Sequence, residues 1–213
     1  MKEIFNTSEK TAIKEAISDL ESNTSGELMV YYTESSDSYE ETYWQLGAIF
    51  GFIASLLIAL YGHLWMLPIG FDATMFGVFV AFAIILGYSL AYYVPAIRLV
   101  LLDKATIEKR AISKAKEVFL EKEIFQLPNR AGILLYISLE EHEVVLLAGE
   151  GINQKVTSQD WVQVIEDIIE GKKRKRLSKG VVEAIHKCEE ILKNAGFTES
   201  NGSNYLSDEV QAG

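Results

Sequence analysis

The sequence is poor in the residues from which several kinds of functional site are built. It has one cysteine, Cys188, which excludes an intramolecular disulfide framework and a zinc site made of several cysteines. Its three histidines are isolated, and none stands in an HExxH pattern. Basic residues are also few, because 20 Lys and Arg stand against 30 Asp and Glu and the net charge is −10. This charge disfavours nucleic-acid binding, which needs a basic face against the phosphates.

The common motifs of nucleophilic and phosphate chemistry are also missing. No GxSxG, no GxxxxGK[ST] and no Asp-x-Asp pair occurs, and the glycines at 149 and 151 are too close together for a phosphate loop. Asn194 stands where a cysteine phosphatase built on Cys188 would have an arginine. If the chain hydrolyses anything, the sequence does not display the nucleophile.

Charge is almost absent from one stretch of the chain. Between residues 42 and 97 the only charged residue is Asp72. Two apolar runs in this stretch, at about 44–62 and 74–94, each approach the ~20 residues needed to cross the hydrocarbon core of a bilayer. We expect a transmembrane helical hairpin whose short loop contains Trp65, Pro68 and Gly70. The alternative, a buried helical pair in a soluble protein, is disfavoured by the length of the runs and their lack of charge.

The charges that flank the hairpin predict its orientation. Lys and Arg occur on the outer sides of both runs and are absent from the loop, so the positive-inside rule places both termini in the cytoplasm. The expected location is therefore a plasma or inner membrane, with two spans. Gly47, Gly51 and Gly77 give the two helices small-residue surfaces for packing.

The polar segments on either side of the hairpin are predicted to form one domain. Residues 1–41 supply its first part, residues 42–97 the hairpin, residues 98–197 its remainder, and the Ser/Asn/Gly-rich residues 198–213 a disordered tail. Asn6 and Glu9 form a capping box for a first helix, which a strand at 27–33 follows. Then come a helix at 96–125, strands at 132–139 and 143–148, a loop at 149–156, a helix capped by Thr157 and a helix at 179–194 that ends near Gly196. This order is typical of a small α/β domain with helices packed on a sheet.

Four of these segments resemble the TPM domain family, which is named for a thylakoid lumen protein, a photosystem II repair protein and a nematode receptor auxiliary protein. Residues 23–28, NTSGEL, resemble the family's (K/N)TSGEI before its first strand. Residues 130–138, RAGILLYIS, are similar to its R(N/T)GVLIYVS strand. Residues 148–153, with Val156 and Trp161, resemble its (A/G)D.GIN..V....W segment, and residues 179–185 its GL..GI helix. The resemblance covers residues 3–34 and 103–197, in order.

The resemblance implies an α/β/α sandwich around a small mixed sheet, largely four-stranded, which the hairpin interrupts here. Members of the family are typically tethered to a membrane or exported. Some are similar to calcium-binding proteins, and a plant relative has been assigned acid phosphatase activity. This sequence departs from the family at Gly149, where an Asp is usual, and thereby loses one expected ligand.

Three carboxylates in the matching segments are candidate metal ligands. Glu27, Glu150 and Asp160 lie at the ends of elements or in loops, where hard oxygen ligands suit calcium or magnesium. Glu150 is placed to replace the ligand missing at Gly149. In the alternative interpretation, Glu27 pairs with a surface cation, Asp160 neutralises a helix N-terminus and Glu150 is solvated.

Two groups of basic residues are candidates for binding anions. Arg130 precedes a buried strand and either binds an anion or carboxylate or forms a structural ion pair. The basic run is either a solvated loop or a surface that faces anionic lipid on the cytoplasmic leaflet. It consists of Lys172, Lys173, Arg174, Lys175 and Arg176.

The leading hypothesis is a non-enzymatic integral membrane protein whose TPM-like domain is an auxiliary or assembly module, with calcium as a modulator. Its expected partners are the lipid bilayer and a membrane protein, and not nucleic acid. One alternative is a metal-dependent, acid-phosphatase-like hydrolase that uses calcium or magnesium. A second alternative is a domain that binds an anionic lipid surface.

Overall fold

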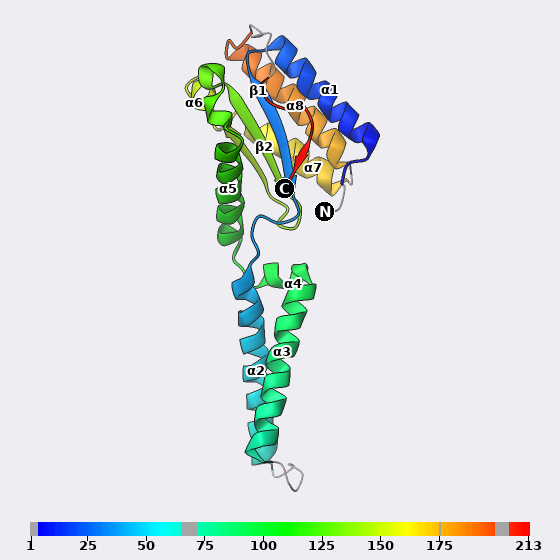
Figure 1. Ribbon diagram of the computed structural model, residues 1–213, viewed down its shortest axis with the longest axis vertical. Helices are drawn as coiled ribbons and strands as arrows, with labels where there is room; N and C mark the ends of the chain where they lie inside the picture. Colours follow the sequence, from blue (N-terminus) through cyan, green and yellow to red (C-terminus); the bar gives the residue numbers. More distant parts are fainter. Residues whose placement is uncertain (1–3, 65–71, 175, 199–204) are drawn as a thin grey trace. The chain divides into compact units, whose positions relative to one another are not determined.

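The computed structural model describes residues 4–64, 72–174, 176–198 and 205–213. The chain divides into two compact units (Figure 1). The first unit combines Met1–Asp37 with Glu108–Gly213, and the second is Ser38–Ile107. The predicted hairpin, 42–97, lies within the second unit, so the first unit is assembled from both sides of it.

The first unit is built on a four-stranded sheet with the order β3-β2-β1-β4. β1 (Glu27–Thr33) and β2 (Gly132–Ser138) run parallel in the centre, and every residue of both is buried. β3 (Val144–Ala148) pairs antiparallel with β2, and β4 (Gln211–Ala212) pairs parallel with β1. The mixed, four-stranded sheet implied by the family resemblance is therefore confirmed.

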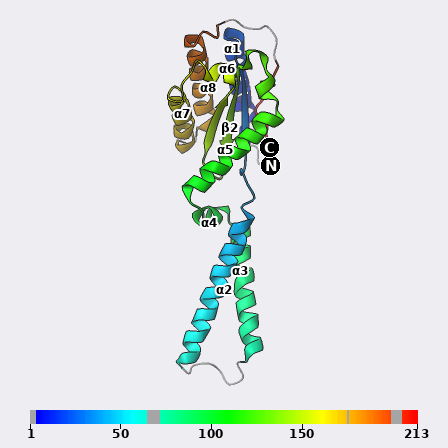
Figure 2. The same cartoon turned by 90° about the vertical axis from the view of Figure 1, so that its left-hand side faces the viewer.

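Helices cover both faces of this sheet (Figure 2). On one face, α1 (Thr7–Asn23), α7 (Val162–Lys173) and α8 (Leu177–Asn194) share a core cluster with alternate strand residues such as Leu28 and Leu135. On the other face, α5 (Lys104–Glu121) and the short 3₁₀ helix η1 (Ile124–Gln126) pack against the intervening residues, among them Met29 and Leu134. Successive side chains of a strand point to opposite faces, so two separate core layers result. The fold is the predicted α/β/α sandwich.

Local signals account for the ends of several elements. The capping box before α1 is formed as predicted, because Asn6 Oδ1 accepts the Glu9 N–H at 2.9 Å and Glu9 Oε2 accepts the Asn6 N–H at 2.9 Å. Gly196 follows α8 with φ of 82°, a conformation that favours glycine.

The predicted helix at 96–125 is wrong as a single element. It is divided into α4 (Pro95–Val100) and α5, which begins at Lys104. Asp103 causes the break, because its carboxylate accepts the Thr106 N–H at 3.1 Å and the Thr106 hydroxyl at 2.6 Å and so begins a new helix.

The segment between β3 and α7 also differs from the prediction. The predicted loop at 149–156 contains a short helix, α6 (Glu150–Asn153), and α7 begins only at Val162. Thr157 does not cap α7. Instead Asp160 accepts hydrogen bonds from the Thr157 N–H at 2.8 Å and its hydroxyl at 2.7 Å and closes a turn before the helix.

Within the segment that the sequence predicts to be a disordered tail, Gln211–Ala212 form β4. Residues 199–204 of that tail lie outside the described residues. The strand is only two residues long, so its sequence carries no periodicity that would have predicted it.

The second unit contains α2 (Glu40–His63) and α3 (Ala73–Tyr93), both long and apolar enough to cross a membrane. A Cβ on Gly87 would lie 2.7 Å from Leu46 O, and one on Gly47 would lie 3.1 Å from Ile84 O, so the two backbones nearly touch there. Gly77 faces no such contact, and Figure 2 shows the helices diverging toward their connecting residues. Trp65, Pro68 and Gly70 of the predicted loop lie outside the described residues.

Candidate functional site

A groove of about 670 Å³ lies on the first unit, where β3 ends and β2 begins. Its apolar side comes from the end of α5 and from η1, and its polar side from the segment before β2 and from α6. The described residues that line it are Phe119, Phe125, Gln126, Leu127, Arg130, Ala148, Gly149 and Glu150. A search by sequence could not assemble this set, because the two sides come from segments that are distant in the chain.

The polar side depends on close backbone packing. A Cβ on Gly149 would lie 2.2 Å from Arg130 O, and a Cβ on Gly151 would lie 2.0 Å from Asn129 O. Asn129 and Arg130 themselves adopt φ of 55° and 50°. This packing is a physical reason for glycine at 149, since the aspartate that is usual in the family would need the 129–130 segment to move.

Arg130 and Glu150 form an ion pair at the rim of the groove. Their side chains are 64% and 60% exposed, so water weakens the attraction between them. The sequence is consistent with Arg130 as either an anion site or a member of a structural ion pair, and the structure gives it a carboxylate partner. Glu150 is therefore engaged with Arg130 rather than solvated alone.

Glu27 lies at the start of β1, where its side chain is buried. Its Oε2 accepts the backbone N–H groups of Tyr205 at 3.2 Å and Leu206 at 3.1 Å. Burial raises the pKa of this carboxyl, while the two hydrogen bonds act in the opposite direction. Glu27 thus binds the C-terminal segment, a role that the sequence does not indicate because that segment is predicted to be disordered.

Asp160 is exposed in the turn before α7 and binds Thr157. The hydrogen bond from the Thr157 hydroxyl is the main cause that lowers the pKa of the Asp160 carboxyl, and the Thr157 N–H adds to it. The helix that Asp160 was expected to neutralise begins after it, at Val162.

The structure does not bring Glu27, Glu150 and Asp160 together as a metal centre. Within the described residues, no three His, Cys, Asp or Glu side chains are grouped so that they could hold a metal ion. Each of the three carboxylates instead has a protein donor of its own. The residues present do not fit a calcium or magnesium site built on this set.

The residues of the basic run have different surroundings. Lys172 belongs to α7, is half-buried, and its Nζ donates to Leu139 O at 2.9 Å. Burial lowers the pKa of Lys172, although Glu141 and Glu143 nearby favour its charged form. Arg174 pairs with Glu170 at 3.0 Å.

Three residues of the basic run remain. Lys173 and Arg176 are exposed, and Lys175 lies outside the described residues. The lipid-facing role of the run stays a prediction.

Comparison with known proteins supports the family resemblance. Residues 91–191 match the model of the TPM domain family, so the chain contains a TPM domain. The match begins within α3 and leaves out β1, which the structure shows paired along its whole length with β2. Residues before the hairpin therefore complete the sheet of this domain.

The NMR structure of the BA42 protein from the psychrophilic bacterium Bizionia argentinensis shares this fold. The two chains are 18% identical with a TM-score of 0.62, and the alignment covers 100% of this chain and 98% of the other. No curated protein matches the sequence. The similarity to BA42 concerns the fold alone.

Proposed function

We propose that this chain is a non-enzymatic integral membrane protein whose TPM domain is an auxiliary or assembly module for a membrane-protein partner. In this proposal α2 and α3 span a plasma or inner membrane, and both flanking segments lie on the cytoplasmic side. The groove at Arg130 and Glu150 is the surface that binds the partner.

The side chains of α2 and α3 support the membrane part of the proposal. Large apolar residues such as Phe52 and Phe82 are 71% and 64% exposed, while glycines occupy the contact between the helices. A contiguous apolar surface of this kind is unfavourable in water and favourable in lipid. The bilayer is thus the expected partner of these two helices.

The lining of the groove is the observation that favours binding over hydrolysis. It combines apolar side chains with one ion pair, and among its described residues there is no Ser, Thr, Cys or His to act as a nucleophile. An apolar floor beside a charged rim is typical of protein interfaces. The partner that fits it presents an apolar side chain next to a charged group.

The test uses a photo-crosslinking amino acid at Phe125 in the full chain, expressed in its membrane. Val162 serves as the matched control, because it is also an exposed apolar residue of the domain but lies outside the groove lining. We expect a discrete cross-linked species from position 125 and not from position 162. The double exchange Arg130→Glu with Glu150→Arg should abolish the species while leaving thermal unfolding almost unchanged. The same cross-links from both positions would overturn the proposal.

The hydrolase alternative makes a different prediction. A purified chain that cleaves p-nitrophenyl phosphate only with calcium or magnesium, and loses this activity when Glu27, Glu150 and Asp160 are changed to alanine, would replace the auxiliary function. The lipid-surface alternative has weaker support, since Lys172 and Arg174 of the basic run already have protein partners.

A further inference from the structure

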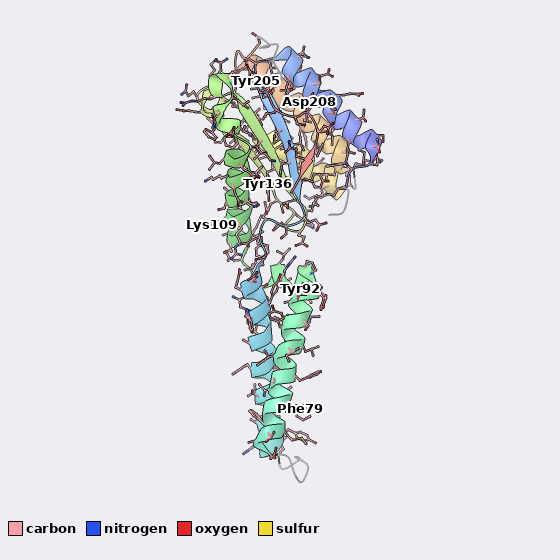
Figure 3. The ribbon with its side chains drawn as sticks, in the orientation of Figure 1. Phe79, Tyr92, Lys109, Tyr136, Tyr205 and Asp208 are labelled. Atoms are coloured by element: carbon pink, nitrogen blue, oxygen red, sulfur yellow. The ribbon has the colours of Figure 1, made fainter. Side chains whose placement is uncertain are left out.

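The two edges of the four-stranded sheet differ in how the chain covers them. At the outer edge of β1, Glu21 accepts the outward Leu28 N–H at 3.2 Å, and burial raises the pKa of Glu21 to about 8. Gln211–Ala212 pair with the same edge, and Figure 3 labels Tyr205 and Asp208 of the segment that leads to them. The opposite edge belongs to β3, beside which the described residues place no further strand.

The backbone groups of β3 alternate between the two sides of the strand. Its ladder with β2 extends from Glu143, whose carbonyl oxygen accepts a hydrogen bond at 2.9 Å, to Gly149, whose N–H donates at 2.8 Å. In an antiparallel ladder every second residue is hydrogen-bonded to its partner, so the odd-numbered residues of 143–149 face β2. The N–H and C=O groups that point away from the sheet belong to Val144, Leu146 and Ala148.

The outer edge of β3 is open to a further strand. Asn153 Nδ2 donates to Ala148 O at 2.7 Å, which leaves the second lone pair of this oxygen available. No described residue donates to or accepts from the backbone of Leu146 on this outer side. The strand sequence VVLLA also has no charge, proline or glycine, which are the features by which proteins commonly block an edge. The edge therefore offers backbone groups and apolar side chains to another strand.

The same strand of a second copy fits this edge. The outward residues are symmetric about Leu146, so two antiparallel copies can pair with Leu146 opposite Leu146 and Val144 opposite Ala148. Each outward N–H of one copy then meets an outward C=O of the other. In the pairs between them, Val145 of one copy lies opposite Leu147 of the other, and apolar pairs of this kind stabilise a sheet. A two-fold axis relates the copies, and the interface is closed.

Charge also complements this pairing at both ends of the ladder. In the same register, Glu143 of one copy lies opposite Gly149 of the other. Gly149 packs against the backbone of Arg130, whose side chain is 64% exposed. Arg130 pairs with Glu150, and its guanidinium has further N–H donors for a second carboxylate. Because of the two-fold axis, the acidic end of each strand meets the arginine of the other copy.

We propose that β3 is a homodimerisation edge, at which two copies of this chain pair antiparallel through residues 143–149 with Leu146 at the two-fold axis. The pairing joins two four-stranded sheets into one continuous sheet. A contact limited to one strand is small, so the association is weak and depends on concentration. The inference goes beyond the proposed function, and of the groove it uses only Arg130.

The first experiment tests the register with single cysteines in the full chain, in detergent micelles. Leu146→Cys places two thiols across the axis, where the paired Cα atoms lie about 5.5 Å apart, a separation that a disulfide spans. Leu120→Cys on α5 is the matched control, because Leu120 is 60% exposed and collisions would oxidise it more readily. We expect mild oxidation to give a disulfide-linked dimer from position 146 and not from position 120, since native Cys188 is buried. Equal yields from both positions, or no dimer from position 146, would overturn the proposal.

The second experiment compares two variants of the same residue. Leu146→Pro removes an outward N–H and spares the ladder with β2, whereas Leu146→Ala keeps that N–H. Both shorten the side chain, so both reduce its packing against the core. We expect the dissociation constant of the dimer to be about tenfold higher for the proline variant than for the alanine variant. Light scattering on the full chain at up to about 100 µM measures it. Equal constants, or a wild-type chain that stays monomeric throughout, would contradict the pairing.

A charge exchange tests the same register without a change in the backbone of β3. Arg130→Glu should weaken the dimer several-fold, because it sets like charges against each other across the interface, and adding Glu143→Arg should restore it. Failure of the second change to restore the dimer would refute the register. Leu146 lies outside the groove lining, so Leu146→Pro should leave a cross-link from Phe125 to a different protein intact. The outcomes of the two proposals therefore remain separate.

Discussion

The two units of this molecule differ in where their large apolar side chains lie. In the TPM domain, Leu28 and Leu134 are 0% exposed, each on a different face of the sheet. In the helical pair, Phe52 and Phe82 are mostly exposed, while Gly47 and Gly87 occupy the contact. The difference shows that apolar composition alone does not define an interior. In the domain, large apolar side chains face the neighbouring element, whereas in the helical pair glycines face it and the large apolar side chains face outward.

Glycine permits a close backbone contact in each of the two units. In the helical pair Gly87 lets two helices approach, whereas in the domain Gly149 lets a strand end approach the carbonyl of Arg130. Both contacts are between backbones, but the first joins two helices that lipid surrounds in our proposal, and the second shapes a groove.

The largest expected effect is a cavity in the domain. Leu134→Ala should lower the free energy of unfolding of the domain by about 3–4 kcal/mol, since the removed methyl groups leave a void between α5 and the sheet. Phe82→Ala should change the free energy of unfolding by less than about 0.5 kcal/mol, because the Phe82 side chain is exposed and its removal leaves no cavity. Denaturant unfolding of both variants in micelles measures the contrast. Similar losses from both would refute the distinction between the units.

A smaller effect is expected from one added methyl group. Gly149→Ala should lower the free energy of unfolding of the domain by about 2–3 kcal/mol. The added Cβ would clash with the backbone oxygen of Arg130, which cannot move aside as a flexible side chain could. The matched change Gly77→Ala in α3 meets nothing within 4 Å and should leave thermal unfolding unchanged. If Gly149→Ala were also neutral, the packing of the groove would be looser than described.

A pH-dependent effect follows from Glu21. The folded chain keeps the proton of Glu21 up to a pKa of about 8, whereas the unfolded chain releases it near the ordinary value of 4.5. The folded state therefore binds more protons between these values, and stability falls as the pH rises through that interval. Glu21→Gln should stabilise the domain by about 1–2 kcal/mol at pH 8 and by almost nothing at pH 4. Thermal unfolding of both chains across this range measures the difference, and parallel curves would contradict the assignment.

The smallest effect on stability is expected at the rim of the groove. Arg130→Gln removes an exposed ion pair and should cost less than about 1 kcal/mol. The same change should nevertheless weaken cross-linking from Phe125 several-fold, because the charged rim of the groove is lost. A large loss of stability with normal cross-linking would make the pair structural rather than functional.

Local patterns in the sequence were enough for the central elements. The capping box at Asn6 and the runs of β-forming residues act over a few positions, so α1, β1 and β2 were predicted nearly as observed. The break at Asp103 was missed because the apolar pattern continues across it. β4 was missed because its two residues depend on the edge of β1 rather than on a pattern of their own.

The candidate site was less accessible to sequence reasoning. Arg130 and Glu150 were singled out separately, and only the folded chain pairs them beside Phe119 and Phe125. Glu27 was chosen as a metal ligand because its position matched the family, but its partners come from the far end of the chain. Such long-range partners depend on the packed fold and leave no spacing in the sequence.

The most direct test of the account is the accessibility of introduced cysteines in sealed membrane vesicles. Native Cys188 is 1% exposed and burial raises its pKa to about 12, so it should not react. With an impermeant maleimide, we predict that Ser22→Cys and Lys173→Cys react from the cytoplasmic side and His63→Cys only from the opposite side. Reaction of all three positions from the same side would contradict a TPM domain anchored by two membrane spans.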